Sequence, residues 1–91
     1  MEISTTATFD RLFKDLPGTI KKKAINKTEI FTKNPFHPSL RVEKLHPKKH
    51  QAWSFRVDIS YRIIFKYIGA NHAELRFIGH HNQIYNYDIF K

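Results

Sequence analysis

Apolar and polar side chains alternate along the second half of the chain. In Trp53–Asp58 the odd positions are apolar and the even positions are polar, which predicts a strand with one buried face. Two further strands are expected at Tyr61–Ile68 and Ala73–Ile78, joined by a hairpin connection at residues 69–72. The polar positions expected to point away from the core are Ser54, Arg56 and Asp58.

Before these strands, apolar residues recur with helical spacing. Residues 9–16 place Phe and Leu side chains at i, i+3, i+4 and i+7, which predicts one face of a short helix with Thr8 as its N-cap. A second helix is expected from Thr19 to Lys33, with its lysines on the solvent side. Asn34 ends this helix, because the residue before a proline is pushed out of the helical region. We expect the two helices to lie antiparallel on one face of the sheet.

The remaining segments are less regular. Residues 2–8 predict a first strand, residues 36–51 predict a loop with a short strand near residues 41–45, and residues 79–91 are aromatic and ambiguous. The order of elements predicts a single α+β domain over residues 1–91, in which two N-terminal helices pack on one face of a largely antiparallel four- to five-stranded sheet. The opposite face of the sheet is then available for a ligand.

Positive charge is concentrated in the first half of the chain. There are 16 Lys and Arg against 8 Asp and Glu, a formal net charge of +8, and residues 11–50 alone contain eleven of those bases and three of the acids. Such a field attracts polyanions, with nucleic acid the leading candidate and an acidic protein the alternative.

The chain has no cysteine, which excludes thiol chemistry and fits a reducing compartment, so we expect a cytoplasmic protein. No apolar run is long enough for a membrane span, and the first residues lack the pattern of a signal peptide.

Three arginines, Arg56, Arg62 and Arg76, are expected to border the uncovered face of the sheet. Guanidinium groups bind phosphate oxygens through paired hydrogen bonds and stabilise negative charge, although each of these arginines is equally explained as a solvated strand residue.

Near the end of the chain, His81 and Tyr85 offer an imidazole and a phenol. RNA cleavage by its own 2′-hydroxyl needs a base for that hydroxyl, a cation for the phosphate oxygens and an acid for the leaving oxygen, and imidazole suits proton transfer at neutral pH.

A metal site is the weaker interpretation of the six histidines. His80 and His81 are expected to point to opposite faces of a strand, and His46 and His50 flank a proline, which prevents a helical i, i+4 pair. We therefore expect no metal. The chain has no Gly-rich phosphate loop, so we expect no nucleotide or other small-molecule cofactor.

Three stretches carry a more specific signal. They are His-Pro-Ser-Leu-Arg at residues 37–41, Trp-Ser-Phe-Arg-Val at 53–57 with Tyr-Arg-Ile-Ile-Phe at 61–65, and Ile-Gly-His-His at 78–81 with Ile-Tyr at 84–85. Together they resemble the RelE/ParE superfamily of toxins from type II toxin–antitoxin modules, in particular its RelE and YafQ members, over nearly the whole chain. The resemblance implies a RelE-like, microbial-RNase-like fold. It also implies a metal-independent endoribonuclease that cuts mRNA in the ribosomal A site and is held in check by a cognate antitoxin protein.

The resemblance also implies roles for particular residues. The implied catalytic residues are Arg56, Arg62, His81 and Tyr85. Arg62 takes the role of the transition-state cation, His81 that of acid or base, and Tyr85 that of a stacking group, with Tyr87 an alternative aromatic. The middle strand has at most one cation where RelE has several lysines, so the general base is left open, with His50 a candidate. The residues expected to contact RNA are Lys44, Lys48, Lys49, His50, Arg76 and Tyr87.

Two other functions compete with the ribonuclease. A ParE-like protein binds DNA gyrase and cleaves nothing, and the same fold carries both activities. A degenerate member of the superfamily acts only by binding. The paired arginines and the His81/Tyr85 ending of the chain favour the nuclease.

Overall fold

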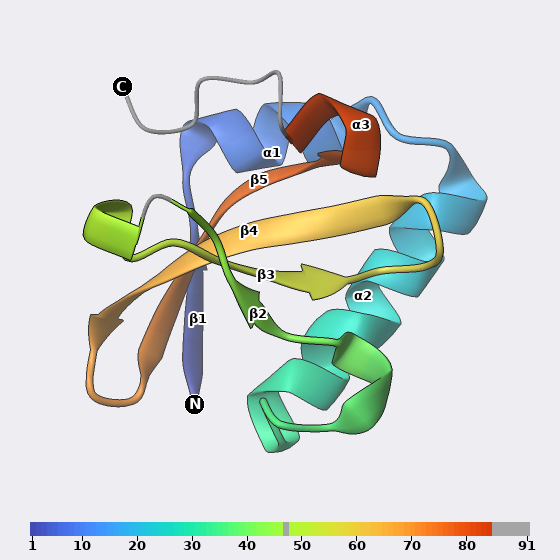
Figure 1. Ribbon diagram of the computed structural model, residues 1–91. Coiled ribbons are helices and arrows are strands. Elements are labelled where there is room, and N and C mark those ends of the chain that lie inside the picture. Colours follow the sequence, from blue (N-terminus) through green and yellow to red (C-terminus); the bar gives the residue numbers. More distant parts are fainter. Residues whose placement is uncertain (47, 85–91) are drawn as a thin grey trace.

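As far as residue 80, helices and strands follow one another along the chain in the order that the sequence predicts, and a short helix follows in the segment that the sequence left ambiguous (Figure 1). The computed structural model describes residues 1–46 and 48–84. Its elements are β1 (Glu2–Thr5), α1 (Ala7–Lys14), α2 (Gly18–Lys33), η1 (Pro38–Leu40), β2 (Glu43–Lys44), η2 (Lys48–His50), β3 (Trp53–Arg56), β4 (Tyr61–Gly69), β5 (His72–His80) and α3 (His81–Ile84). Within the described residues, no helix is long and apolar enough to cross a membrane.

The strands form one five-stranded sheet in the order β1-β5-β4-β3-β2. Strand β1 pairs with β5 in parallel, and the other three pairings are antiparallel. The prediction of an α+β fold with a largely antiparallel sheet of four to five strands is therefore confirmed. The hairpin between β4 and β5 turns at residues 70–71, inside the connection expected from the sequence.

The two long helices differ in how well their starts were predicted. Helix α2 begins at Gly18 and ends at Lys33, within one residue of the expected bounds. Helix α1 begins two residues earlier than expected, and the prediction of Thr8 as its N-cap is wrong. The N-cap is Thr6, whose extended backbone continues from β1 and whose side-chain oxygen accepts a 3.1 Å hydrogen bond from the Phe9 amide.

The main core lies between the helices and one face of the sheet. Phe31 of α2 stacks on Phe55 of β3 with ring centroids 4.8 Å apart and meets Phe65 of β4 edge-on at 4.7 Å. All three rings are fully buried. The odd positions Phe55 and Val57 are buried as the alternation predicts, because they face these helices.

The other face of the sheet is partly covered, which corrects the expectation that it is bare. Leu45, Ala52, Ile64 and Phe77 form a second apolar cluster on that face. The chain on either side of η2 folds back over the sheet, and the Leu45 amide donates to the Ala52 carbonyl at 2.8 Å. Ser54, which was expected to point away from the core, is opposite Ile64 of this cluster and only 1% exposed. A polar site on this face must therefore lie beyond the cluster, toward one end of the sheet.

Candidate functional site

Two arginines lie directly opposite each other where β3 and β4 meet the turn that joins them. Arg56 and Arg62 are partners in the antiparallel register, and Arg62 is in turn opposite Gly79 of β5. Directly opposed residues of antiparallel strands present their side chains on the same face, with Cβ atoms about 5 Å apart, and like charges in this arrangement are destabilising. Two arginines on one face give this end of the sheet positive charge, which favours a bound anion.

Arg56 carries a second unfavourable feature. Its Nε atom is buried and has no hydrogen-bond acceptor within residues 1–46 and 48–84. Leaving a buried donor unsatisfied costs about 1–3 kcal/mol, and such a group in a native structure calls for a functional explanation. A phosphate oxygen is an acceptor of the right kind for a guanidinium N–H.

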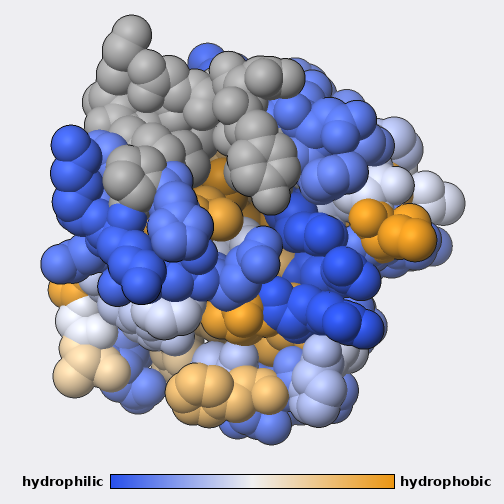
Figure 2. Space-filling view, viewed as in Figure 1, coloured by the Kyte–Doolittle hydropathy of each residue, from blue (hydrophilic) through white to orange (hydrophobic). Residues whose placement is uncertain are grey.

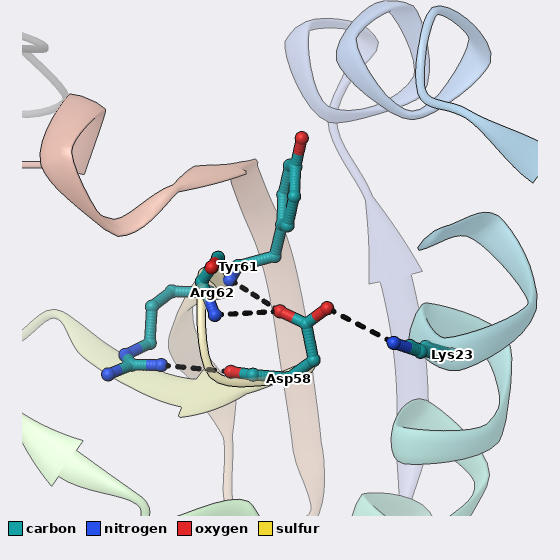
Figure 3. Close-up of polar contacts among 5 residues, drawn as sticks. Lys23, Asp58, Tyr61 and Arg62 are labelled. Atoms are coloured by element: carbon teal, nitrogen blue, oxygen red, sulfur yellow. Dashed lines mark hydrogen bonds and ion pairs between the residues drawn. The ribbon is translucent and has the colours of Figure 1, made fainter. Parts of the chain in front are cut away.

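The turn between β3 and β4 is held together by Asp58 (Figure 3). Its Oδ1 atom accepts hydrogen bonds from the amides of Ser60 and Tyr61, both at 2.8 Å, and its Oδ2 atom is 3.4 Å from the Lys23 ammonium of α2. Its backbone carbonyl accepts a hydrogen bond from Nη1 of Arg62 at 3.3 Å. Burial alone would raise the pKa of Asp58, but the two amide hydrogen bonds and Lys23 outweigh it, so the pKa lies below its ordinary value. The carboxyl group is ionised at neutral pH.

His81 stands beside the same turn. It is the first residue of α3, and its amide donates a 2.6 Å hydrogen bond to the Ser60 carbonyl. The ring of His80 lies 5.7 Å from the ring of Tyr61 and 5.6 Å from that of His81. The expectation that the two histidines point to opposite faces of a strand is therefore wrong, because β5 ends at His80 and α3 begins at His81.

Gly79 allows the chain to close over this end of the sheet. A Cβ atom at this position would lie 2.7 Å from Oε1 of Gln83 and 3.0 Å from the ring of Phe77. The same Oε1 atom accepts a 2.9 Å hydrogen bond from the His80 amide. The glycine thus lets Gln83 pack over β5 and fix the chain just before His81.

The remaining residues expected to contact RNA do not gather at this end. Lys44 is opposite Trp53 in the register and its ammonium lies 5.4 Å from the centre of that ring, so it is on the helix side of the sheet. Arg76 lies three residues before Gly79, about 10 Å along the strand, and its guanidinium is bound to Glu74 at 2.8 Å.

The second group of expected RNA contacts lies in η2, before the first residue of β3. Lys48 and Lys49 are exposed there, and His50 is partly buried. Arg56 is at the other end of β3, so these basic residues extend the charged surface instead of completing the arginine pair. The predicted residues Tyr85 and Tyr87 lie outside the described part of the chain.

The surface on the side seen in Figure 1 combines apolar and charged character. Figure 2 shows apolar surface near the centre of this view, with strongly hydrophilic residues on both sides of it. Such a mixture suits a ligand that has both charged and apolar parts, as a nucleic acid strand has phosphates and bases. Among the described residues, no three His, Cys, Asp or Glu side chains are grouped so that they could hold a metal ion.

Two residues of this site were not singled out from the sequence. Asp58 was treated as a polar strand position, although an aspartate two residues before a serine, between two strands, is the pattern of a side chain that caps its own turn. Lys23 is one of the lysines expected on the solvent-exposed face of α2, and no local sequence pattern links it to Asp58. That contact depends on how α2 packs against the sheet.

Comparison with known proteins identifies solved structures that share this architecture. No family model matches the sequence, and no curated protein matches it. Among solved structures, YafQ from E. coli strain BL21(DE3) superposes with a TM-score of 0.75 at 14% sequence identity, covering 92% of this chain and 97% of that chain. RelE in the RelB-RelE antitoxin-toxin complex from Methanococcus jannaschii superposes with a TM-score of 0.73 at 22% identity, covering 93% and 98%.

A third structure extends the same likeness. The YoeB/ParE toxin from Agrobacterium tumefaciens superposes with a TM-score of 0.73 at 16% identity, covering 89% of this chain and 99% of that chain. Each of the three superpositions covers most of this chain and nearly all of the other. Because the sequence identities are low, the superpositions show a shared fold and nothing further. The chain described here therefore has the fold of the RelE, YafQ and YoeB toxins.

Proposed function

We propose that this protein is the toxin of a type II toxin–antitoxin module and that it acts as a metal-independent endoribonuclease on mRNA in the ribosomal A site. The observation that carries the proposal is the cross-strand pair of Arg56 and Arg62, with His81 bound to the same turn, on a toxin fold. The net charge of +8 supports a polyanionic substrate. The site of action is the cytoplasm, where mRNA is translated.

The proposed roles follow from the chemistry of each side chain. Arg56 and Arg62 bind the scissile phosphate through their guanidinium groups and stabilise the charge that develops on its oxygens. His81 transfers a proton, either from the attacking 2′-hydroxyl or to the leaving 5′-oxygen. Tyr85 stacks against a base of the substrate.

The proposed regulatory partner is a cognate antitoxin. Several structures with this fold are complexes with an antitoxin, among them RelB-RelE from Methanococcus jannaschii and the DinJ-YafQ complex from E. coli. A partner that covers the arginine pair with negative charge would block substrate at the same time. An acidic segment has the matching charge.

Expression of this chain without a partner is expected to arrest growth, and the variants Arg62→Ala and His81→Ala are expected to relieve the arrest. Removal of one positioned proton-transfer group lowers the rate about 10²- to 10⁴-fold. The measurement is cleavage of mRNA on purified translating ribosomes, mapped by primer extension. Arg11→Ala, which removes the same charge from an exposed position of α1, is the matched control and should cleave as the parent does.

The competing gyrase-inhibitor function makes a different prediction in the same cells. It requires gyrase-linked DNA breaks and intact mRNA, and it gives His81 no part in proton transfer. Arrest that persists in both variants, with DNA breaks and uncut mRNA, would contradict the ribonuclease.

A further inference from the structure

We propose that Asp58 is a positioning residue that sets the places of Arg62 and His81 by fixing the β3–β4 turn. The inference rests on the proposed ribonuclease function. Asp58 itself need not touch the substrate, since it acts through two backbone carbonyls of the turn. Those carbonyls belong to residues 58 and 60.

The side chain of Asp58 determines the shape of the turn. Its Oδ1 atom accepts from the amides of Ser60 and Tyr61 at 2.8 Å each, while the Val57 amide donates to the Tyr61 carbonyl at 2.9 Å. A carboxylate that bonds backbone amides two and three residues ahead fixes the local backbone in the same way as a helix cap. The orientation of the peptide units that carry the Ser60 and Tyr61 amides therefore depends on one side chain.

Both site residues are bound to carbonyls of this turn. Arg62 Nη1 donates to the Asp58 carbonyl at 3.3 Å, and the His81 amide donates to the Ser60 carbonyl at 2.6 Å. Arg62 comes from β4, and His81 follows β5, so the turn ties two strands to one point. A peptide unit that rotates in the turn moves one carbonyl or the other and shifts the group bound to it.

The simpler alternative is that Asp58 serves only as the ion-pair partner of Lys23. That contact is 3.4 Å long, and the Lys23 side chain is 55% exposed. An ion pair at such a position contributes little. The two amide contacts are shorter and lie on the less exposed side of the carboxylate, so they carry the positioning role.

Asparagine separates the two explanations. Its amide oxygen can accept the same two backbone hydrogen bonds as Asp58 Oδ1, but it has no charge for Lys23. Alanine removes both kinds of contact. The comparison of Asp58→Asn with Asp58→Ala therefore asks whether the geometry of the turn or the ion pair matters.

The test measures kcat and KM for mRNA cleavage on translating ribosomes with the full chain. Asp58→Ala is expected to lower kcat about tenfold to a hundredfold with little change in KM, since a displacement of about 1 Å is enough for such a loss. Asp58→Asn is expected to stay within about fivefold of the parent. Asp58→Ser keeps one acceptor at this position and is expected to fall between them, which provides a result if the alanine variant does not fold.

Amide hydrogen exchange measured by NMR gives a readout that does not depend on activity. The amides of Tyr61 and His81 should exchange at least about tenfold faster in Asp58→Ala than in the parent or in Asp58→Asn. The amides of Ile63 and Ile78 in the sheet should keep their protection. If the parent cleaves no mRNA, the proposed function fails, and this exchange pattern decides the positioning role by itself.

Two results would overturn the inference. One is equal kcat in the parent and Asp58→Ala with unchanged exchange at His81. The other is an equal loss in Asp58→Asn and Asp58→Ala while His81 exchange stays as in the parent, which would mean that the charge and not the turn is responsible.

Discussion

Phe55 and Arg56 are neighbours in β3, yet their side chains meet opposite kinds of partner on the two faces of the sheet. Phe55 is opposite Ile63 and packs against Phe31, all of them fully buried. Arg56 is opposite Arg62 and leaves a buried Nε atom without an acceptor among the described residues. One face thus holds stabilising contacts, and the other holds two like charges opposite each other, which suits an anionic ligand or partner.

This contrast is sharpest at one end of the molecule. Toward η2, the second face also has an apolar cluster, with Ile64 and Phe77 buried beneath the loop that contains Leu45. Toward the β3–β4 turn, the same face has the arginine pair. The sheet is therefore not divided simply into a core face and a functional face, since stability and function also divide along the strands.

The largest expected effect comes from the stabilising side. Phe55→Ala should lower the free energy of unfolding by about 3–5 kcal/mol, because it removes a buried ring and leaves a cavity between α2 and the sheet. That is a large part of the stability of a small domain. Urea denaturation followed by circular dichroism measures the change. A loss below about 1 kcal/mol would show that the core can close around the missing ring.

Replacing Arg56, the residue next to Phe55, should raise the free energy of unfolding instead of lowering it. Arg56→Met keeps a long side chain but removes the unsatisfied Nε and the like charge opposite Arg62, so the free energy of unfolding should rise by about 1 kcal/mol. Cleavage of mRNA should fall in the same variant. The same denaturation experiment, run beside the ribosome assay, tests both. A variant that is less stable than the parent would mean that Arg56 contributes to the fold.

The smallest expected effect concerns pH and Asp58. A carboxyl group whose pKa is lowered by folding stabilises the protein above its unfolded pKa, and this contribution is lost as the pH falls through the folded pKa. Asp58→Asn should therefore be less stable than the parent at pH 7, by about 1 kcal/mol or less. The difference should shrink below pH 3.8, the ordinary value for this group.

Urea denaturation of the parent and Asp58→Asn at several pH values between neutral and strongly acidic measures that difference. A gap between the two proteins that stays constant into acid would show that ionisation of Asp58 does not account for the difference in their stability.

The positions of the helices and strands were predicted more accurately than the N-cap of α1 and the burial of Ser54. The helix expected at Thr19–Lys33 and the alternation that begins at Trp53 depend only on local sequence, and both were found within one residue of where they were expected to begin. The N-cap of α1 was misplaced from Thr6 to Thr8, because either threonine can cap a helix and only the backbone leaving β1 selects one. Ser54 was misjudged because alternation tells which residues share a face and not what covers that face.

The candidate site shows the same limit. Arg56, Arg62 and His81 were named from the sequence, and the structure places the arginines in register and ties the His81 backbone to their turn. Lys44 and Arg76 were also named from the sequence. Lys44 lies on the helix side of the sheet, and Arg76 is paired with Glu74. The roles of Asp58 and Gly79 depend on contacts between β3, β4, β5 and α3, which no local pattern contains.

The sequence by itself determined the order of helices and strands, the positive charge and the residue types that suit phosphate chemistry, because periodicity and composition are properties of neighbours along the chain. Only the tertiary structure decided that Arg56 is opposite Arg62, that Leu45 joins an apolar cluster with Ile64 and Phe77, and that one aspartate accepts the backbone hydrogen bonds of the β3–β4 turn. The physical reason is that strand register and long-range packing are set by the sum of many weak contacts, whose partners lie far apart in the sequence.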